Sequence, residues 1–138
     1  EDGSVLCVID LDTVMPSYVF SDYGDFLRSA ANTGAEDDRN LDNVRFNMDI
    51  FRAFTRGYLE SARSFLLPVE IENLPYAAAL FPYMQCVRFL TDYLNGDTYY
   101  KIAYPEHNLV RTAAQFKLWQ SVKEHQEEMK AFISQCVG

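Results

Sequence analysis

Two carboxylates one residue apart are the first candidates for chemistry. Asp10 and Asp12 lie in the stretch VIDLDT, directly after the apolar run Val5–Ile9. Such a run is typical of a short buried strand. Carboxylate oxygens fixed at the end of a strand suit a divalent cation such as Mg²⁺. A plain turn is the alternative, because Asp favours loop starts through hydrogen bonds to the backbone.

The composition indicates the kind of chain that must position these acids. The sequence has 138 residues, of which 49% are hydrophobic, and this is enough for one packed core. The net charge of −8 argues against a nucleic-acid-binding face and against docking on an anionic membrane. We therefore expect a single domain with neither nucleic acid nor membrane among its partners.

The cysteines and the N-terminus bear on the cellular compartment. Cys7, Cys86 and Cys136 lie in apolar stretches without metal-ligand spacing, so we expect buried, reduced thiols. No apolar run approaches the length of a membrane span, and the N-terminal residues EDGS are not typical of a signal peptide. These features favour a cytoplasmic protein.

The first predicted element is incomplete without a partner. The residues DGS before Val5 favour the second half of a β-hairpin, and a lone strand leaves its backbone hydrogen bonds unpaired. We therefore expect the chain to be a C-terminal fragment of a larger protein.

The rest of the sequence has a helical pattern. Helices are predicted at residues 22–32, 46–65, 69–74, 75–94 and 108–133, with a polar loop at 35–43. Ser21 or Asp22 is the expected N-cap of the first helix, and Asp25 the expected partner of Arg28. The last helix is expected to bury one apolar face, which consists of Leu109, Ala113, Phe116, Trp119, Val122, Met129 and Ile133. The predicted fold class is mainly α, with a short β remnant at the N-terminus.

Three stretches together carry a resemblance. The stretch VIDLDTV, then SDYGDFLR, and later the run CVRFLTDYLNGDTYYK from Cys86 to Lys101 resemble the C-terminal lobe of aminoglycoside-phosphotransferase-like kinases. The last run is similar to the N-acetylhexosamine 1-kinase branch. The resemblance implies the helical C-terminal lobe of a protein-kinase-like fold, acting on a sugar with ATP and Mg²⁺.

The resemblance also implies roles for three acids. Asp10 matches the aspartate that holds the Mg²⁺ bridging the nucleotide phosphates. Asp12 either joins the metal shell or orients the loop that carries Asp10. Asp22 matches the acid that anchors the catalytic loop, and a plain helix N-cap is its alternative.

Two further residues match sugar contacts of that branch. Arg88 supplies a fork of hydrogen-bond donors, and Tyr99 supplies an aromatic face with a hydroxyl, a pairing that suits a sugar ring. For Arg88 the alternative is a helical ion pair with Asp92, four residues further on.

Several parts of such a kinase are not found in the sequence. The His-Gly/Asn-Asp catalytic loop, the Asn that follows it, and the nucleotide-binding lobe with its Lys have no match, so the chain alone is expected to be inactive. Some relatives carry a mucin-desulfating name, but the Cys/Ser-x-Pro-x-Arg motif of sulfatases does not occur either. The expected function is sugar 1-phosphorylation. The alternatives are an aminoglycoside- or choline-type kinase and a non-catalytic helical interaction domain.

Overall fold

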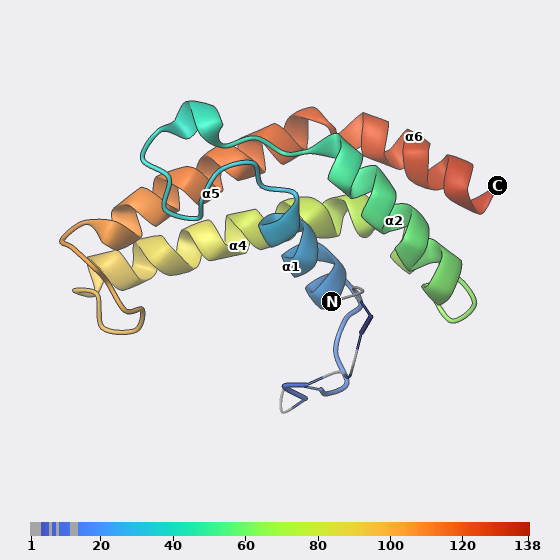
Figure 1. Cartoon of the computed structure of the whole chain (residues 1–138), viewed down its shortest axis with the longest axis horizontal. Helices are drawn as coiled ribbons and strands as arrows, with labels where there is room; N and C mark the ends of the chain where they lie inside the picture. The colour runs from blue at the N-terminus through green and yellow to red at the C-terminus, as the bar shows by residue number, and fades with distance from the viewer. Residues whose placement is uncertain (1–3, 6, 8, 12–13) are drawn as a thin grey trace.

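Two long helices lie antiparallel along the long axis of the molecule (Figure 1). The structure is a computed structural model that describes residues 4–5, 7, 9–11 and 14–138. Helix α4 spans Leu74–Leu94 and helix α5 spans His107–Glu124, with a loop of residues 95–106 between them. Helix α6, Gln126–Val137, follows α5 almost directly. The α4–α5 hairpin is the frame against which the other helices pack.

The remaining helices precede this hairpin in the sequence. They are α1 (Phe20–Ala30), the 3-10 turn η1 (Leu41–Asn43), α2 (Met48–Ala62) and α3 (Pro68–Glu72). The described residues contain no strand, and only an isolated bridge joins Asn32 to Phe46. The predicted mainly helical class is confirmed. No helix in the described part of the chain has both the length and the apolar character needed to cross a membrane.

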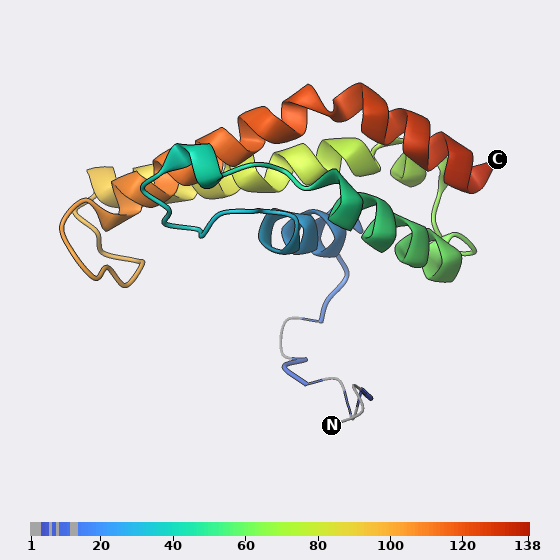
Figure 2. The same ribbon diagram turned by 45° about the horizontal axis from the view of Figure 1, so that its top comes forward.

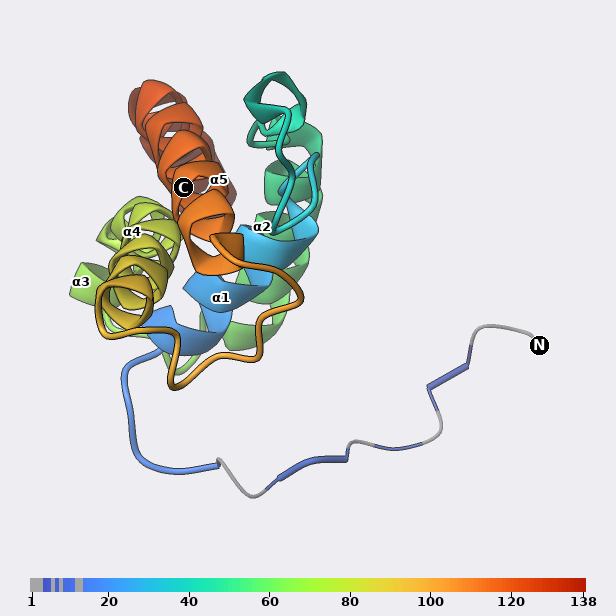
Figure 3. The same cartoon turned by 90° about the vertical axis from the view of Figure 1, so that its left-hand side faces the viewer.

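Helix α1 crosses α4, and α2 packs against α6 (Figure 3). The crossing is close because Gly24 has no side chain: a Cβ atom there would lie 2.6 Å from the carbonyl oxygen of Ala77. Beside it, the fully buried Tyr23 forms a hydrogen bond of 2.7 Å between its hydroxyl and Oγ1 of Thr55. This bond joins α1 to α2 inside the core, where an unpaired hydroxyl would be costly.

Local sequence signals account for where α2 and α3 begin. The Asn47 side chain accepts hydrogen bonds from the amides of Asp49 and Ile50, which caps α2. Pro68 opens α3, where its missing N–H costs nothing, and the Glu70 carboxylate accepts from the amide of Leu67. The predicted break between these two helices is confirmed.

The N-cap predicted for α1 is wrong. The helix begins at Phe20, and Val19 occupies the cap position without a side-chain hydrogen bond. Val19 and Phe20 pack against the core. Because this burial stabilises helical backbone there, the helix begins before the N-cap predicted from Ser21 and Asp22. Asp22 is exposed in the first turn, where its charge is favourable to the helix dipole.

The single C-terminal helix predicted for residues 108–133 is also wrong. His125 separates α5 from α6, and its amide bonds to the carbonyl of Val122, one residue short of the α-helical partner. The predicted apolar face is only partly correct, because Val122, Met129 and Ile133 are buried but Leu109, Ala113 and Phe116 are exposed. The buried face of α5 instead contains polar side chains together with apolar ones: His107, Asn108, Ala114, Gln115, Leu118, Ser121 and Val122.

The described residues before α1 lead away from the helices (Figure 2). Val5 and Ile9 are 86% and 77% exposed, and neither lies in a strand. The predicted buried strand is therefore absent from the described residues of this stretch, which offer it no pairing partner. Cys7 is exposed, contrary to the prediction, whereas Cys86 is buried as expected and Cys136 is half-buried.

Candidate functional site

A groove lies where α4 ends and the loop of residues 95–106 begins. It has a volume of about 410 Å³ and contains both of the predicted sugar contacts, Arg88 and Tyr99. Its lining combines apolar, aromatic and hydrogen-bonding side chains: Val87, Arg88, Thr91, Asp92, Asn95, Thr98, Tyr99 and Tyr100. A concave surface of this composition is typical of a site for a small polar ligand.

The sequence places a sharp turn directly after α4. Gly96 has φ +85°, a left-handed conformation that glycine adopts without strain. Asp97 follows with φ +57°, which Asp tolerates better than most residues. Its amide also bonds to the backbone carbonyl of Asp92 at 2.8 Å, which satisfies the end of the helix. The chain therefore reverses tightly and returns over the last turn of α4.

The buried carboxylate of Asp92 holds the returning loop. It accepts hydrogen bonds from the amides of Thr98, Tyr99 and Tyr100 at 3.0, 2.8 and 2.9 Å. It also accepts from Nδ2 of Asn108 on α5 at 2.8 Å. Four donors thus meet one carboxylate that is only 5% exposed, which offsets the cost of burying it.

These contacts change the acidity of Asp92. Burial acts to raise the pKa of this carboxyl, but the hydrogen bonds from Tyr100, Tyr99, Thr98 and Asn108 outweigh that effect. The pKa therefore lies below its ordinary value. At neutral pH the carboxylate is charged and acts only as an acceptor.

Arg88 and Tyr99, predicted from the sequence as a pair, do lie together. The guanidinium carbon of Arg88 is 5.9 Å from the ring centroid of Tyr99 and 5.5 Å from that of Tyr100. The two rings meet edge to face, with centroids 4.8 Å apart. Both Arg88 and Tyr99 are exposed, so donors and an aromatic face are open to solvent side by side.

The alternative role of Arg88, an ion pair with Asp92, is wrong. No ion pair within the described residues joins them, because the Asp92 carboxylate is occupied by the loop amides and Asn108. Arg88 instead donates from Nη1 to Oε1 of Gln85 at 3.2 Å. Gln85 in turn donates to the hydroxyl of Tyr100 at 3.2 Å, so the guanidinium is steered toward the rings.

The loop is fastened at its far end by His107. Nδ1 of this buried imidazole accepts from the amide of Ala103 at 3.1 Å, which leaves the proton on Nε2 to be donated to Asp37 at 2.9 Å. The hydrogen bond from His107 lowers the pKa of the Asp37 carboxyl. The loop is therefore anchored to α5 and to the segment between α1 and α2.

The predicted metal ligands do not form a site in the described part of the chain. Asp10 is exposed with φ +64°, and Asp12 lies outside the described residues. The described residues contain no group of three or more His, Cys, Asp or Glu side chains that could hold a metal ion. Asp22 lies on α1, and the catalytic loop that it is predicted to anchor has no match in this sequence. The predicted pair of Asp25 with Arg28 is confirmed, at 2.8 Å.

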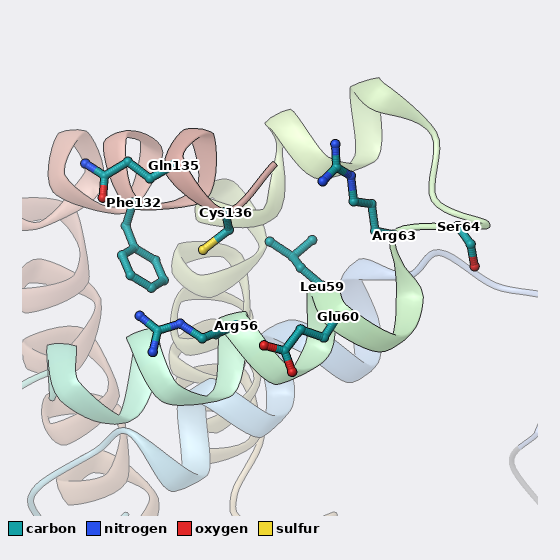
Figure 4. Close-up of a pocket in the computed structure, with 8 residues that line it drawn as sticks. All are labelled: Arg56, Leu59, Glu60, Arg63, Ser64, Phe132, Gln135 and Cys136. Atoms are coloured by element: carbon teal, nitrogen blue, oxygen red, sulfur yellow. The ribbon is translucent and has the colours of Figure 1, made fainter. Parts of the chain in front are cut away.

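A larger cleft of about 750 Å³ lies between α2 and α6, and its arginines have a structural explanation (Figure 4). Arg56 lies over the ring of Phe132, with its guanidinium carbon 5.8 Å from the centroid. Arg63 donates to the carbonyl of Val137. Outside the cleft, Arg52 pairs with Glu128. Arg52 and Arg56 of α2 and the adjoining Arg63 thus hold α6 along its length, so the groove at the end of α4 is the better candidate site.

Asp92 and Asn108, which hold the wall of the groove in place, are not identified as site residues by the sequence. The sequence predicts Asp92 only as a helical partner of Arg88, and it predicts no site role for Asn108. One signal was available: an Asp in the last turn of a helix, followed by Asn-Gly, can accept from the amides of a returning loop. Asn108 gives no such signal, because its partners are 16 and 11 residues away.

Comparison with models of known protein families gives no match for this chain. The candidate site therefore rests on the geometry described above.

Proposed function

We propose that this chain is the helical lobe of an ATP-dependent sugar kinase and that the groove at the end of α4 binds the sugar. The proposed substrate is an N-acetylhexosamine with a free anomeric hydroxyl, which receives the phosphoryl group, in accordance with the resemblance of residues 86–101. The observation that carries the proposal is the juxtaposition of the Arg88 guanidinium with the Tyr99 and Tyr100 rings in one groove.

The groove offers what a sugar ring requires. The C–H face of a pyranose packs on an aromatic ring, and Tyr99 exposes 74% of its surface. Hydroxyl and acetamido oxygens accept hydrogen bonds, and the Arg88 guanidinium presents several donors beside that ring. Thr91 and Asn95, which also line the groove, can donate or accept. In this role the chain binds and orients the sugar.

The nucleotide and its metal ion need more than the described residues supply. Asp10 is the one proposed metal ligand that the structure describes, and no metal-binding group surrounds it there. We therefore derive no step through Mg²⁺ or ATP, and the metal roles of Asp10 and Asp12 stay predictions. When bound, such an ion would neutralise the nucleotide phosphates.

The test is the affinity of the chain for N-acetylglucosamine and N-acetylgalactosamine, measured by NMR titration of the ¹⁵N-labelled protein. Arg88→Met keeps the apolar stem but removes the charged donors, whose hydrogen bonds are worth about 1.5–3 kcal/mol each. We expect the Kd for the sugar to rise roughly tenfold or more.

Arg45→Met is the matched control. Arg45 is also exposed, but it lines a different pocket beside Ser121 and His125. The same change of side chain there should leave the sugar Kd unchanged. Equal effects of the two substitutions, or no sugar binding by the unaltered chain, would contradict the proposal.

A further inference from the structure

Three consecutive amides of the groove wall converge on one carboxylate. Thr98 and Tyr99 donate to Oδ1 of Asp92, and Tyr100 donates to Oδ2. Hydrogen bonds to backbone amides fix the path of the main chain. The Asp92 carboxylate therefore fixes the backbone positions from which the Tyr99 and Tyr100 side chains extend. Of these three residues, Tyr99 and Tyr100 are the ones that lie beside Arg88.

The same carboxylate has no capacity left for a ligand. Its second oxygen also accepts from Nδ2 of Asn108, a fully buried side chain on α5. Asn108 is itself fixed, because its Oδ1 accepts from Nη1 of Arg111 at 3.1 Å and its Nδ2 also donates to Asp97 at 2.8 Å. The guanidinium of Arg111 lies over the Phe89 ring, one residue after Arg88 on α4. Asp92 is thus tied to both helices and to the loop.

We infer that Asp92 is a positioning residue, whose carboxylate holds the Tyr99 and Tyr100 rings against Arg88 and forms no hydrogen bond with the ligand. Asn108 and Arg111 support it from α5. The part of this inference that concerns sugar affinity rests on the proposed function. The part that concerns the arrangement of the rings does not.

The variant Asp92→Asn tests the inference. The substitution keeps the size of the side chain but replaces one acceptor oxygen with an NH₂ group, which faces N–H donors. We expect the loop to leave the carboxylate position and the rings to leave Arg88. The direct readout is the chemical shift of the Arg88 side-chain Nε–H, which we expect the ring currents of Tyr99 and Tyr100 to displace in the unaltered protein. In the variant this displacement should disappear.

Asp97→Asn is the matched control, with the same chemical change in the same loop. Asn tolerates the left-handed backbone at position 97, and its side-chain oxygen can still accept from Asn108. The Arg88 signal should stay as in the unaltered protein. In an N-acetylglucosamine titration we expect the Kd to rise roughly tenfold for Asp92→Asn and less than about twofold for Asp97→Asn, where tenfold equals about 1.4 kcal/mol.

The two readouts separate the possible failures. If the Arg88 signal is unchanged in a folded Asp92→Asn variant, the inference is wrong, regardless of the Kd for the sugar. If the unaltered chain binds no sugar but the signal still moves, the positioning role stands and the proposed function fails. A variant that shifts the signal but keeps the sugar affinity refutes the link between them.

If Asp92→Asn does not fold, acid titration of the unaltered protein tests the inference instead. The amides of Thr98, Tyr99 and Tyr100 should shift together as Asp92 takes up a proton, and the Arg88 signal should move at the same midpoint. Asp97 and Arg111 are the charged groups that share the Asn108 side chain with this carboxylate, and the three amides report on Asp92 directly. An Arg88 signal that does not follow them overturns the inference.

Discussion

At the scale of single residues, the candidate site depends on one aromatic pair, one guanidinium and one buried carboxylate. Resemblance of residues 86–101 pointed to Arg88 and Tyr99, and the structure brings these two together. Asp92 could not be assigned in the same way, because its role depends on a loop that returns over the helix. An i,i+4 spacing favours an ion pair only when nothing else competes for the carboxylate.

The acidity of Asp92 predicts how stability depends on pH. Its pKa is lowered in the folded state, so its contribution to stability is fully present above the ordinary aspartate pKa of about 3.9. The contribution is lost as the pH falls through the lower, folded-state pKa. We expect the difference in unfolding free energy between the unaltered chain and Asp92→Asn to shrink as the pH is lowered below about 4.

Urea unfolding at a series of pH values between 7 and 2 measures this difference. Asp97→Asn serves as the reference for acid effects that do not involve Asp92. A difference that stays constant across this range would show that Asp92 does not titrate with a lowered pKa in the folded protein.

At the scale of helices, the sequence predicts which segments are helical better than where they end and which way they face. Asn47 and Pro68 are local signals, and the starts of α2 and α3 follow from them. The start of α1 and the break at His125 depend on packing between distant segments. Apolar periodicity does not predict the buried polar residues of α5. Asn108 and Ser121 are buried because they form hydrogen bonds with distant segments.

Two glycines give a matched test of the helix packing. At Gly24 a methyl group would lie 2.4 Å from Cδ2 of Phe81 and 2.6 Å from the Ala77 carbonyl oxygen, so α1 and α4 would be forced apart. We expect Gly24→Ala to reduce the unfolding free energy by about 1–3 kcal/mol. At Gly57 on α2 nothing lies within 4 Å of such a methyl group. Gly57→Ala should therefore stabilise the protein, by about 0.5–1 kcal/mol.

Thermal or urea unfolding of the two variants measures both effects. Because the chemical change is identical and both positions are helical, the opposite signs isolate the close contact of α1 with α4. Stabilisation of the chain by both substitutions would contradict that crossing.

At the scale of the whole molecule, the loop of residues 95–106 lies at one end of the α4–α5 hairpin, and α2 and α6 lie toward the other (Figure 1). The groove is at the loop end. The mainly helical class followed from the periodicity of the sequence, whereas the strand before Asp10 was not found among the described residues. A strand depends on a partner that its own sequence does not specify. The predicted metal site belongs to the same stretch, of which the structure describes Asp10 but not Asp12, so that site stays a prediction.

The central claim is that a sugar binds on Tyr99 beside Arg88. The most direct measurement is an isotope-filtered NOE experiment on the labelled chain in the presence of unlabelled N-acetylglucosamine. We expect NOEs from the sugar C–H protons to the Tyr99 ring and to the side chain of Val87, which lines the same groove. NOEs confined to other surfaces, such as the Phe132 ring in the α2–α6 cleft, or no intermolecular NOEs at a sugar concentration that shifts the protein signals, would contradict it.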